Sequence, residues 1–156
     1  MKWNYIAIPI VVLCVAYIGR LFTESGLSWL WTLQQPSWTP DGSVIGLVWL
    51  GIYLCMTAFA LIIWNTVPRK EVGCEVCVIF GLLIFNALLN VLWSYFFFVL
   101  RSPGLAFFDL LLLEATNIYI LYTAYQVKRW TVWLIVPYVL WVAFAGILNY
   151  LIYTLN

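Results

Sequence analysis

Five long apolar runs constrain this sequence more than any other feature. They cover residues 5–22, 44–64, 76–100, 105–127 and 130–153. A helix needs about 20 mostly apolar residues to cross the hydrocarbon core of a bilayer, and the runs come close to that length or exceed it. Since they do not alternate between apolar and polar residues as the strands of a lipid-facing barrel do, they predict five transmembrane helices.

The composition supports a membrane environment. Hydrophobic residues make up 66% of the chain and charged residues only 8%, whereas a soluble domain carries about 25% charged residues. The formal net charge of +1 provides no basic surface, so nucleic acid is not an expected partner. Five helices leave no room for a separate soluble domain. We therefore expect one all-helical integral membrane domain over residues 1–156.

The basic residues predict how the chain is oriented. Those expected on the side of the N-terminus are Lys2, Arg69, Lys70, Lys128 and Arg129. Only Arg20 and Arg101 are expected on the opposite side. The positive-inside rule therefore predicts a cytoplasmic N-terminus, with the first connection between helices outside. The first run lacks a small-x-small cleavage site before Arg20, so we expect it to be a retained helix and not a signal peptide.

The connection between the first two runs carries the features of an ordered loop. Pro36 and Pro40 flank Trp38 and Thr39, and proline disfavours a helix interior. Thr39 before Pro40 predicts the N-cap of the second helix. A rigid loop bearing an aromatic residue suggests a lid over a ligand site; the alternative is a connector whose Trp38 lies in the interfacial aromatic belt. Residues 23–35 predict a short helix or turn at the interface.

Three stripes of residues, spaced three or four apart, lie on the second, third and fifth runs. They consist of Ile45, Trp49 and Tyr53; of Asn86, Asn90, Trp93 and Phe97; and of Trp141, Ala145 and Asn149. Such spacing places each stripe on one face of a helix. Asparagines are costly in an apolar helix unless their amides are satisfied, so we expect the stripes to face the interior. Alternatively, the asparagines serve only interhelical hydrogen bonds.

The tryptophans of these stripes predict a binding site. Trp49, Trp93 and Trp141 would converge beneath the loop, where their indole rings suit a flat, apolar, aromatic guest. The sequence contains no phosphate-binding glycine loop and no pairing of a nucleophile with a base. We therefore expect a ligand-binding protein before an enzyme with a conventional catalytic site.

Two acidic residues interrupt the fourth run. Asp109 lies near the expected outer end of its helix, where an ion pair with Arg20 or Arg101 would be structural. Glu114 lies near the midplane, where we expect it to be protonated or directed at polar groups such as Asn117. An acid at this depth also raises an alternative function, which is proton-coupled transport.

Proline and cysteine residues allow two further predictions. Pro137 lies inside the fifth run and predicts a kink in that helix. Cys74 and Cys77 form a C-x-x-C pair at the start of the third run. Zinc would need more ligands and the chain has no histidine, so we expect neither a metal site nor a redox role.

Several short motifs, taken together, resemble one known family. They are Gln35-Pro36-Ser37-Trp38-Thr39-Pro40, Gly46-Leu47-Val48-Trp49, Asn90-Val91-Leu92-Trp93, Asp109-Leu110-Leu111-Leu112, and Pro137-Tyr138-Val139-Leu140-Trp141-Val142-Ala143-Phe144 followed by Asn149-Tyr150. In this order they are similar to the tryptophan-rich sensory protein and translocator protein family (TspO/MBR), also called the peripheral-type benzodiazepine receptor family. The resemblance covers the chain from the first loop to the last helix.

The resemblance implies a fold, ligands and a site. It implies a five-helix bundle in a bacterial cell membrane, often dimeric, that binds protoporphyrin IX and isoquinoline- or benzodiazepine-type ligands and senses porphyrin or oxidative stress. It implies that protoporphyrin IX is a ligand or substrate and that no further cofactor is bound. The ligand-binding positions that carry over are Trp38, Pro40, Trp49, Tyr53, Asn90, Trp93, Trp141 and Ala145. Some bacterial members degrade protoporphyrin in light, a reaction for which Trp49 and Trp141 would be the required residues.

The chain departs from the family pattern at a few positions. Asp41 stands where a second proline is usual, and Gln35 stands where lysine is common. No basic residue follows Tyr150, so the sequence does not complete the pattern proposed for cholesterol recognition, which animal members carry. Glu114 replaces a small or apolar residue. The main alternative to porphyrin binding and sensing is a membrane transporter of porphyrins or other hydrophobic small molecules.

Overall fold

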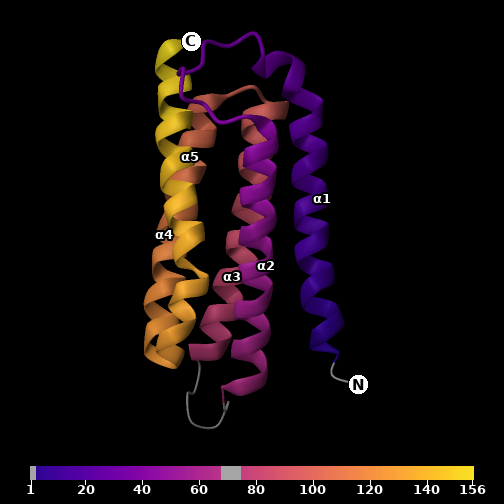
Figure 1. The fold of residues 1–156 in the computed structure, drawn as a ribbon, viewed down its shortest axis with the longest axis vertical. Coiled ribbons are helices and arrows are strands. Elements are labelled where there is room, and N and C mark those ends of the chain that lie inside the picture. Colours follow the sequence, from indigo (N-terminus) through magenta and orange to yellow (C-terminus); the bar gives the residue numbers. More distant parts are fainter. Residues whose placement is uncertain (1–2, 68–74) are drawn as a thin grey trace.

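The computed structural model describes residues 3–67 and 75–156, which form a bundle of long helices (Figure 1). The helical elements are α1 (Asn4–Leu30), α2 (Gly42–Thr66), α3 (Glu75–Ser94), the π-helical turn η1 (Tyr95–Val99), α4 (Pro103–Lys128), the 3-10 helix η2 (Arg129–Leu134) and α5 (Val136–Leu155). Within the described residues, five helical segments are long and apolar enough to span a membrane, and strands are absent. The predicted fold class is confirmed, and the chain is a multi-pass integral membrane protein.

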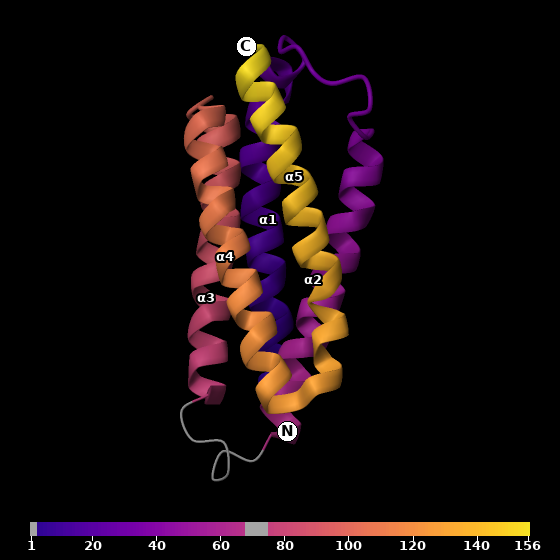
Figure 2. The ribbon, with the colours of Figure 1, turned by 90° about the vertical axis from the view of Figure 1, so that its left-hand side faces the viewer.

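The helices pack unevenly around the bundle. The backbone of α4 lies close to both α3 and α5, while α1 lies on the other side of the bundle and contacts α2 and α3. Figure 2 shows the same arrangement from the side of α4 and α5. The seam between α2 and α5 lacks the close backbone packing that joins α4 to its two neighbours. Apolar side chains fill the centre, of which Phe59, Ile63, Ile79 and Ile120 are fully buried.

The end of α1 is fastened to η1 through a glycine. A Cβ atom added to Gly26 would lie 2.5 Å from the carbonyl oxygen of Phe98, so the two backbones can approach this closely only without a side chain here. Trp29, in the next turn of α1, packs its ring edge-on against Phe97 at a centroid distance of 5.6 Å. These contacts hold α1 against the bundle near the connection between α1 and α2.

Three local predictions were wrong. Helix α1 continues to Leu30, so residues 23–35 do not form a separate interfacial segment. Helix α2 begins at Gly42 after Asp41; Thr39 is not its N-cap, and its hydroxyl instead donates to the Pro36 carbonyl at 2.7 Å. Pro137 lies in the first turn of α5, where a missing amide donor costs little, and not within a kinked helix. The preceding residues form η2 instead of the first turns of α5.

The loop between α1 and α2 is tied to the end of α5. The backbone N–H of Gln34 donates to Oδ1 of Asn156 at 2.9 Å, and Nδ2 of Asn156 donates back to the Gln34 carbonyl at 3.0 Å. Gln35 donates through Nε2 to the Leu30 carbonyl at 3.1 Å, which caps the end of α1. The expectation of an ordered loop is met by these contacts.

The charged residues do not pair as the sequence suggested. Arg20 pairs with Glu24 at 2.7 Å on the exposed face of α1. Asp109 is buried, and its Oδ2 has no hydrogen-bond partner in the described part of the chain, so the predicted ion pair is wrong. Arg101 adopts a left-handed backbone with φ of 52° in the turn from η1 to α4, and its side chain is exposed. Cys77 is exposed, while Cys74 lies outside the described residues.

Candidate functional site

The first part of the candidate site is an aromatic group on facing sides of α2 and α5. Trp49 stacks on Tyr53, one turn further along α2, with ring centroids 5.6 Å apart and an angle of 30° between the rings. The edge of Trp49 also contacts Tyr138 of α5, at a centroid distance of 6.0 Å. Tyr138 lies one helical turn before Trp141, so this contact places Trp49 against the helix turn that precedes the α5 stripe.

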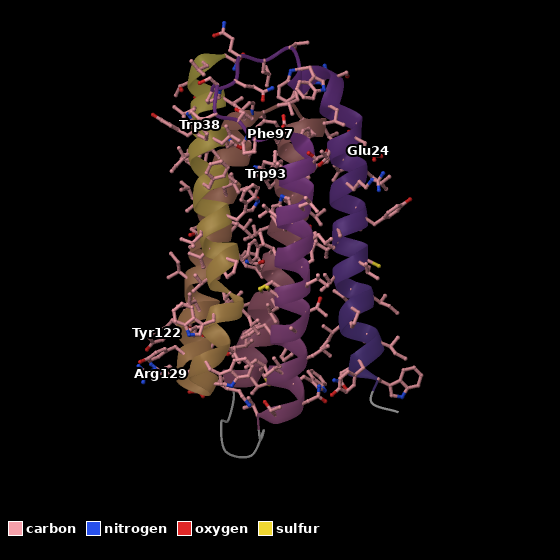
Figure 3. All side chains as sticks on the ribbon, viewed as in Figure 1. Glu24, Trp38, Trp93, Phe97, Tyr122 and Arg129 are labelled. Atoms are coloured by element: carbon pink, nitrogen blue, oxygen red, sulfur yellow. The ribbon has the colours of Figure 1, made fainter. Side chains whose placement is uncertain are left out.

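The second part joins the loop to α5. Trp141 stacks on Phe144 with centroids 5.2 Å apart, and Trp38 from the loop contacts the same Phe144 ring at 5.6 Å. Figure 3 shows Trp38 below the loop, beside the upper part of α5. Trp38 remains 47% exposed. The loop therefore places one indole over the end of the α2–α5 seam without closing it.

The indole nitrogen of Trp141 is the most unusual polar atom of this group. Nε1 of Trp141 is buried, yet the described residues provide no acceptor for its hydrogen. Leaving a buried donor unsatisfied costs about 1–3 kcal/mol, so natural proteins rarely keep one without a reason. A bound molecule with an acceptor atom in the seam would satisfy it.

Trp93 has a different environment, because its indole hydrogen is already used. Nε1 of Trp93 donates to Oδ1 of Asn149 on α5 at 3.1 Å, and Nδ2 of Asn149 donates to the Pro103 carbonyl at 2.7 Å. The ring of Trp93 stacks on Phe97 at 5.5 Å, and both are labelled below the loop in Figure 3. Trp93 thus ties α3 to α5 and lines the interior mainly through its ring.

A chain of polar side chains crosses the middle of the bundle. The hydroxyl of Tyr53 donates to Oδ1 of Asn90 at 3.3 Å, and Nδ2 of Asn90 donates to the hydroxyl of Tyr138 at 3.1 Å. Tyr138 in turn donates to Oδ1 of Asn86 at 3.0 Å. Both asparagines of the α3 stripe therefore form hydrogen bonds with side chains of neighbouring helices. This agrees with the alternative in which the asparagines serve interhelical hydrogen bonds.

The chain continues into α4 and ends at an acid. Nδ2 of Asn86 donates to Thr116 Oγ1 and to Asn117 Oδ1, each at 2.8 Å. Asn117 donates through Nδ2 to Oε2 of Glu114 at 3.4 Å. Glu114 lies in a groove of about 290 Å³ between α4 and α5, together with residues such as Val142 and Gly146. Glu114 therefore points at Asn117, one of the polar groups expected for it.

A larger cavity, of about 410 Å³, lies between α1, α2 and α3. Of the predicted site residues, only Tyr53 and Asn90 line it; the rest of its wall comes from mostly apolar residues of these helices, from Asn4 and Asn86, and from Tyr138 of α5. The three tryptophans of the stripes do not belong to this wall. They pack instead against the main hydrophobic core. The cavity was not predicted, because no stripe on the first run had been identified.

The structure brings most of the predicted site residues into two neighbouring groups. Trp49, Tyr53 and Asn90 meet at Tyr138, and Trp38 and Trp141 meet at Phe144. The other three are Trp93, which is bound to Asn149, and the half-buried Pro40 and Ala145. Sequence reasoning did not give Tyr138 or Phe144 a role in the site. The available signal was their spacing, because they lie three residues before and three residues after Trp141 and so share its helix face.

Known proteins are similar to this chain over most of its length. The model of the TspO/MBR family matches residues 7–154. The Tryptophan-rich protein TspO of Bacillus cereus is 29% identical over 156 residues, which are 100% of this chain and 99% of that protein. The protein of the same name from Chlorobaculum tepidum is 34% identical over 92% of this chain and 90% of its own length. Human Translocator protein is 35% identical over 90% of this chain and 82% of its own length. The chain therefore belongs to the TspO/MBR family.

Proposed function

We propose that the protein binds a flat tetrapyrrole such as protoporphyrin IX in the α2–α5 seam, between Trp49 and Trp141. The observation that carries this proposal is the buried indole N–H of Trp141, which has no acceptor in the described part of the chain. The ring of Trp141 itself stacks on Phe144. A porphyrin has a wide aromatic face for these rings and acceptor atoms on its edges. Aromatic pairs contribute about 0.5–1.5 kcal/mol beyond the burial of their area, so two flanking indoles favour such a guest.

The packing between α2 and α5 would allow the seam to open for a ligand. Helices α2 and α5 lack close backbone packing and meet in the ring contact of Trp49 with Tyr138, so side chains can rearrange around a guest with little cost to the helices. Ala145 follows Trp141 by one turn and is small, which leaves space at that level. Trp38 lies over the end of the seam, where it would cover the bound molecule.

We further propose the finer features that the family resemblance implies. The protein would sense porphyrin or oxidative stress from a bacterial cell membrane, with its N-terminus in the cytoplasm and a second copy as a partner. The isoquinoline- and benzodiazepine-type ligands would use the same seam, since they are also flat and aromatic. Under light, indoles against an excited porphyrin would support its oxidation by dioxygen to an open-chain product, with Trp49 and Trp141 as the contacting residues.

A second candidate function is transport of a hydrophobic small molecule. The observation that favours it is the hydrogen-bonded chain from Tyr53 to Glu114, which connects the interior to a groove on the face of α4 and α5. A protonatable end to such a chain is a feature of proton-coupled carriers. Four relatives, among them the human and bovine proteins, carry the name Translocator protein, which agrees with this candidate but does not assign a cargo.

The binding proposal is tested by titrating the purified protein with protoporphyrin IX and following its Soret absorbance. Trp141→Phe keeps an aromatic ring but removes the N–H, and we expect it to weaken binding about five- to tenfold, as for one hydrogen bond. Trp133→Phe is the matched control, because Trp133 is 73% exposed and lies in η2, outside the stripes. Equal affinities of both variants and the unsubstituted protein would contradict the role given to the Trp141 N–H.

The photochemical part is tested separately. The complex is illuminated in the presence of dioxygen and its products are separated, with free protoporphyrin IX in the same detergent as the control. An open-chain product that forms faster than in the control, and slower in Trp49→Phe, supports turnover. Equal loss of porphyrin with and without protein would show that the protein binds the porphyrin but does not degrade it.

A further inference from the structure

The cavity between α1, α2 and α3 is elongated. Its lining covers residues 3–15 of the chain on the side of α1 and residues 52–64 on α2. At 1.5 Å per residue, each of these stretches is about 18 Å long. A space of about 410 Å³ that is this long suits one extended hydrocarbon chain.

One polar atom in the wall of this cavity has no partner. Asn4, in the first turn of α1, is only 9% exposed, and its Nδ2 is buried without an acceptor among the described residues. Asn4 belongs to the lining of the cavity. An amide donor buried without an acceptor destabilises a protein, so such donors are rare. An acceptor oxygen of a bound molecule at this end of the cavity would remove that cost.

The opposite end of the cavity offers no such atom. The polar residues there are Tyr53, Asn86, Asn90 and Tyr138. Their hydroxyl and amide groups already form hydrogen bonds with one another and with α4. The remaining wall is apolar, for example at Met56, Leu83 and Ala87. A guest therefore meets a free donor at the N-terminal end of α1 and a satisfied, mostly apolar surface at the middle of the bundle.

We infer that this cavity binds a single-chain lipid, with its acyl chain along α1 and a carbonyl or carboxylate oxygen accepting a hydrogen bond from Nδ2 of Asn4. The side of the cavity toward the membrane is consistent with entry from the bilayer, because Ile84 lines it and is 63% exposed. The first turn of α1 adds the positive end of the helix dipole near Asn4, which also favours an oxygen acceptor there. This site adjoins the porphyrin seam, with which it shares Tyr53, Asn90 and Tyr138, but its wall on α1 and the donor of Asn4 belong to it alone, and either site can exist without the other.

The inference is tested with 9,10-dibromostearic acid, whose bromines quench tryptophan fluorescence on contact. Trp64 lies in the cavity wall, so quenching of its fluorescence reports binding in the cavity. Ala87→Phe fills the cavity, and Leu88→Phe adds a ring at the next position of α3, which is 58% exposed and outside the lining. We expect saturable quenching near one molecule per chain, displaced by unlabelled stearic acid, retained in Leu88→Phe and lost in Ala87→Phe. Quenching that never saturates, or that persists in Ala87→Phe, would overturn the inference.

The role of Asn4 is tested with Asn4→Leu, which removes the donor but keeps a side chain of similar length. Asn65→Leu is the matched control, since Asn65 donates within its own helix to the Leu61 carbonyl and lies outside the lining. We expect Asn4→Leu to weaken binding of dibromostearic acid about five- to tenfold, and Asn65→Leu to leave it unchanged. Equal affinities in the two variants would overturn the assigned orientation of the lipid.

A second probe separates a bound single-chain lipid from the surrounding bilayer. Phosphatidylcholine with brominated acyl chains is compared with dibromostearic acid in the same nanodiscs. Equal quenching by both, with equal sensitivity to Ala87→Phe, would show that ordinary bilayer lipid fills the cavity and would overturn the inference. Protoporphyrin IX titrations of the same variants show whether the porphyrin seam is intact. Loss of both bindings would indicate a misfolded variant, in which case the milder Asn4→Leu decides the question.

Discussion

The indole N–H of Trp93 on α3 donates a hydrogen bond to Oδ1 of Asn149 on α5, across a distance of 3.1 Å. Nδ2 of Asn149 in turn donates a hydrogen bond to the Pro103 carbonyl at the start of α4. One buried amide thus joins three helices near the loop end of the bundle. Its environment is closed to water, as Asn149 is 2% exposed.

We expect Asn149→Leu to lower the free energy of unfolding by about 1–3 kcal/mol, because it leaves the Trp93 N–H and the Pro103 carbonyl without their partner. Thermal unfolding in detergent, followed by circular dichroism, measures the loss. Asn65→Leu is a control with the same change at a side chain that donates within its own helix, to the Leu61 carbonyl. A loss no larger in Asn149→Leu than in this control would show that the bond is not structurally important.

Tyr138 is the centre of the polar chain, since its hydroxyl accepts from Asn90 and donates to Asn86. We expect Tyr138→Phe to destabilise the protein by about 1–3 kcal/mol, because two buried amide groups lose a partner at once. Tyr150→Phe provides a control, as Tyr150 is 48% exposed. Unfolding curves of the two variants should differ clearly; coincident curves would contradict the assignment of Tyr138 as the hub.

The close contact of Gly26 with Phe98 predicts a sharp difference between two glycines. Gly26→Ala would force α1 away from η1, and overpacking of this kind typically costs about 1–3 kcal/mol. Gly51 lies inside α2 with no atom within 4 Å of an added Cβ, so Gly51→Ala should be neutral or stabilising. The melting temperatures of both variants test this. A Gly26→Ala protein as stable as Gly51→Ala would be incompatible with the described packing of α1.

Glu114 separates the two candidate functions. It lies in the groove between α4 and α5, away from the ring contacts of the α2–α5 seam. We therefore expect Glu114→Gln to leave the affinity for protoporphyrin IX unchanged in Soret titrations. Flux of protoporphyrin IX into proteoliposomes is measured in parallel. Flux that depends on a pH gradient and disappears in Glu114→Gln would favour transport over sensing.

Much of the fold could be predicted from the sequence, because length and apolar content alone decide which segments can cross a bilayer. The facing of the stripes followed from the cost of burying Asn86, Asn90 and Asn149 without partners. The course of α1 beyond residue 22 could not be predicted in this way. Its last turns hold polar residues, and they remain helical because Thr23 and Ser25 donate to carbonyls of the same helix while Gly26 permits contact with η1.

The candidate site was predictable in part for a related reason. Spacing identifies which residues share a helix face, so Trp49 was grouped correctly with Tyr53, on whose ring it stacks. Spacing does not tell which residue of another helix completes the group. The roles of Tyr138 and Phe144, and the cavity beside α1, depend on how the helices are placed relative to one another. The free N–H of Trp141 and the free Nδ2 of Asn4 likewise become visible only in three dimensions.

The most direct test of the proposed function is an experimentally determined structure of the protein with protoporphyrin IX bound. We predict density for the macrocycle between the rings of Trp49 and Trp141, with an acceptor atom of the ligand at hydrogen-bond distance from Nε1 of Trp141 and Trp38 over its edge. A porphyrin located on the outer surface of the bundle, with Trp49 still packed edge-on against Tyr138 and the Trp141 N–H still unpaired, would contradict the proposed site.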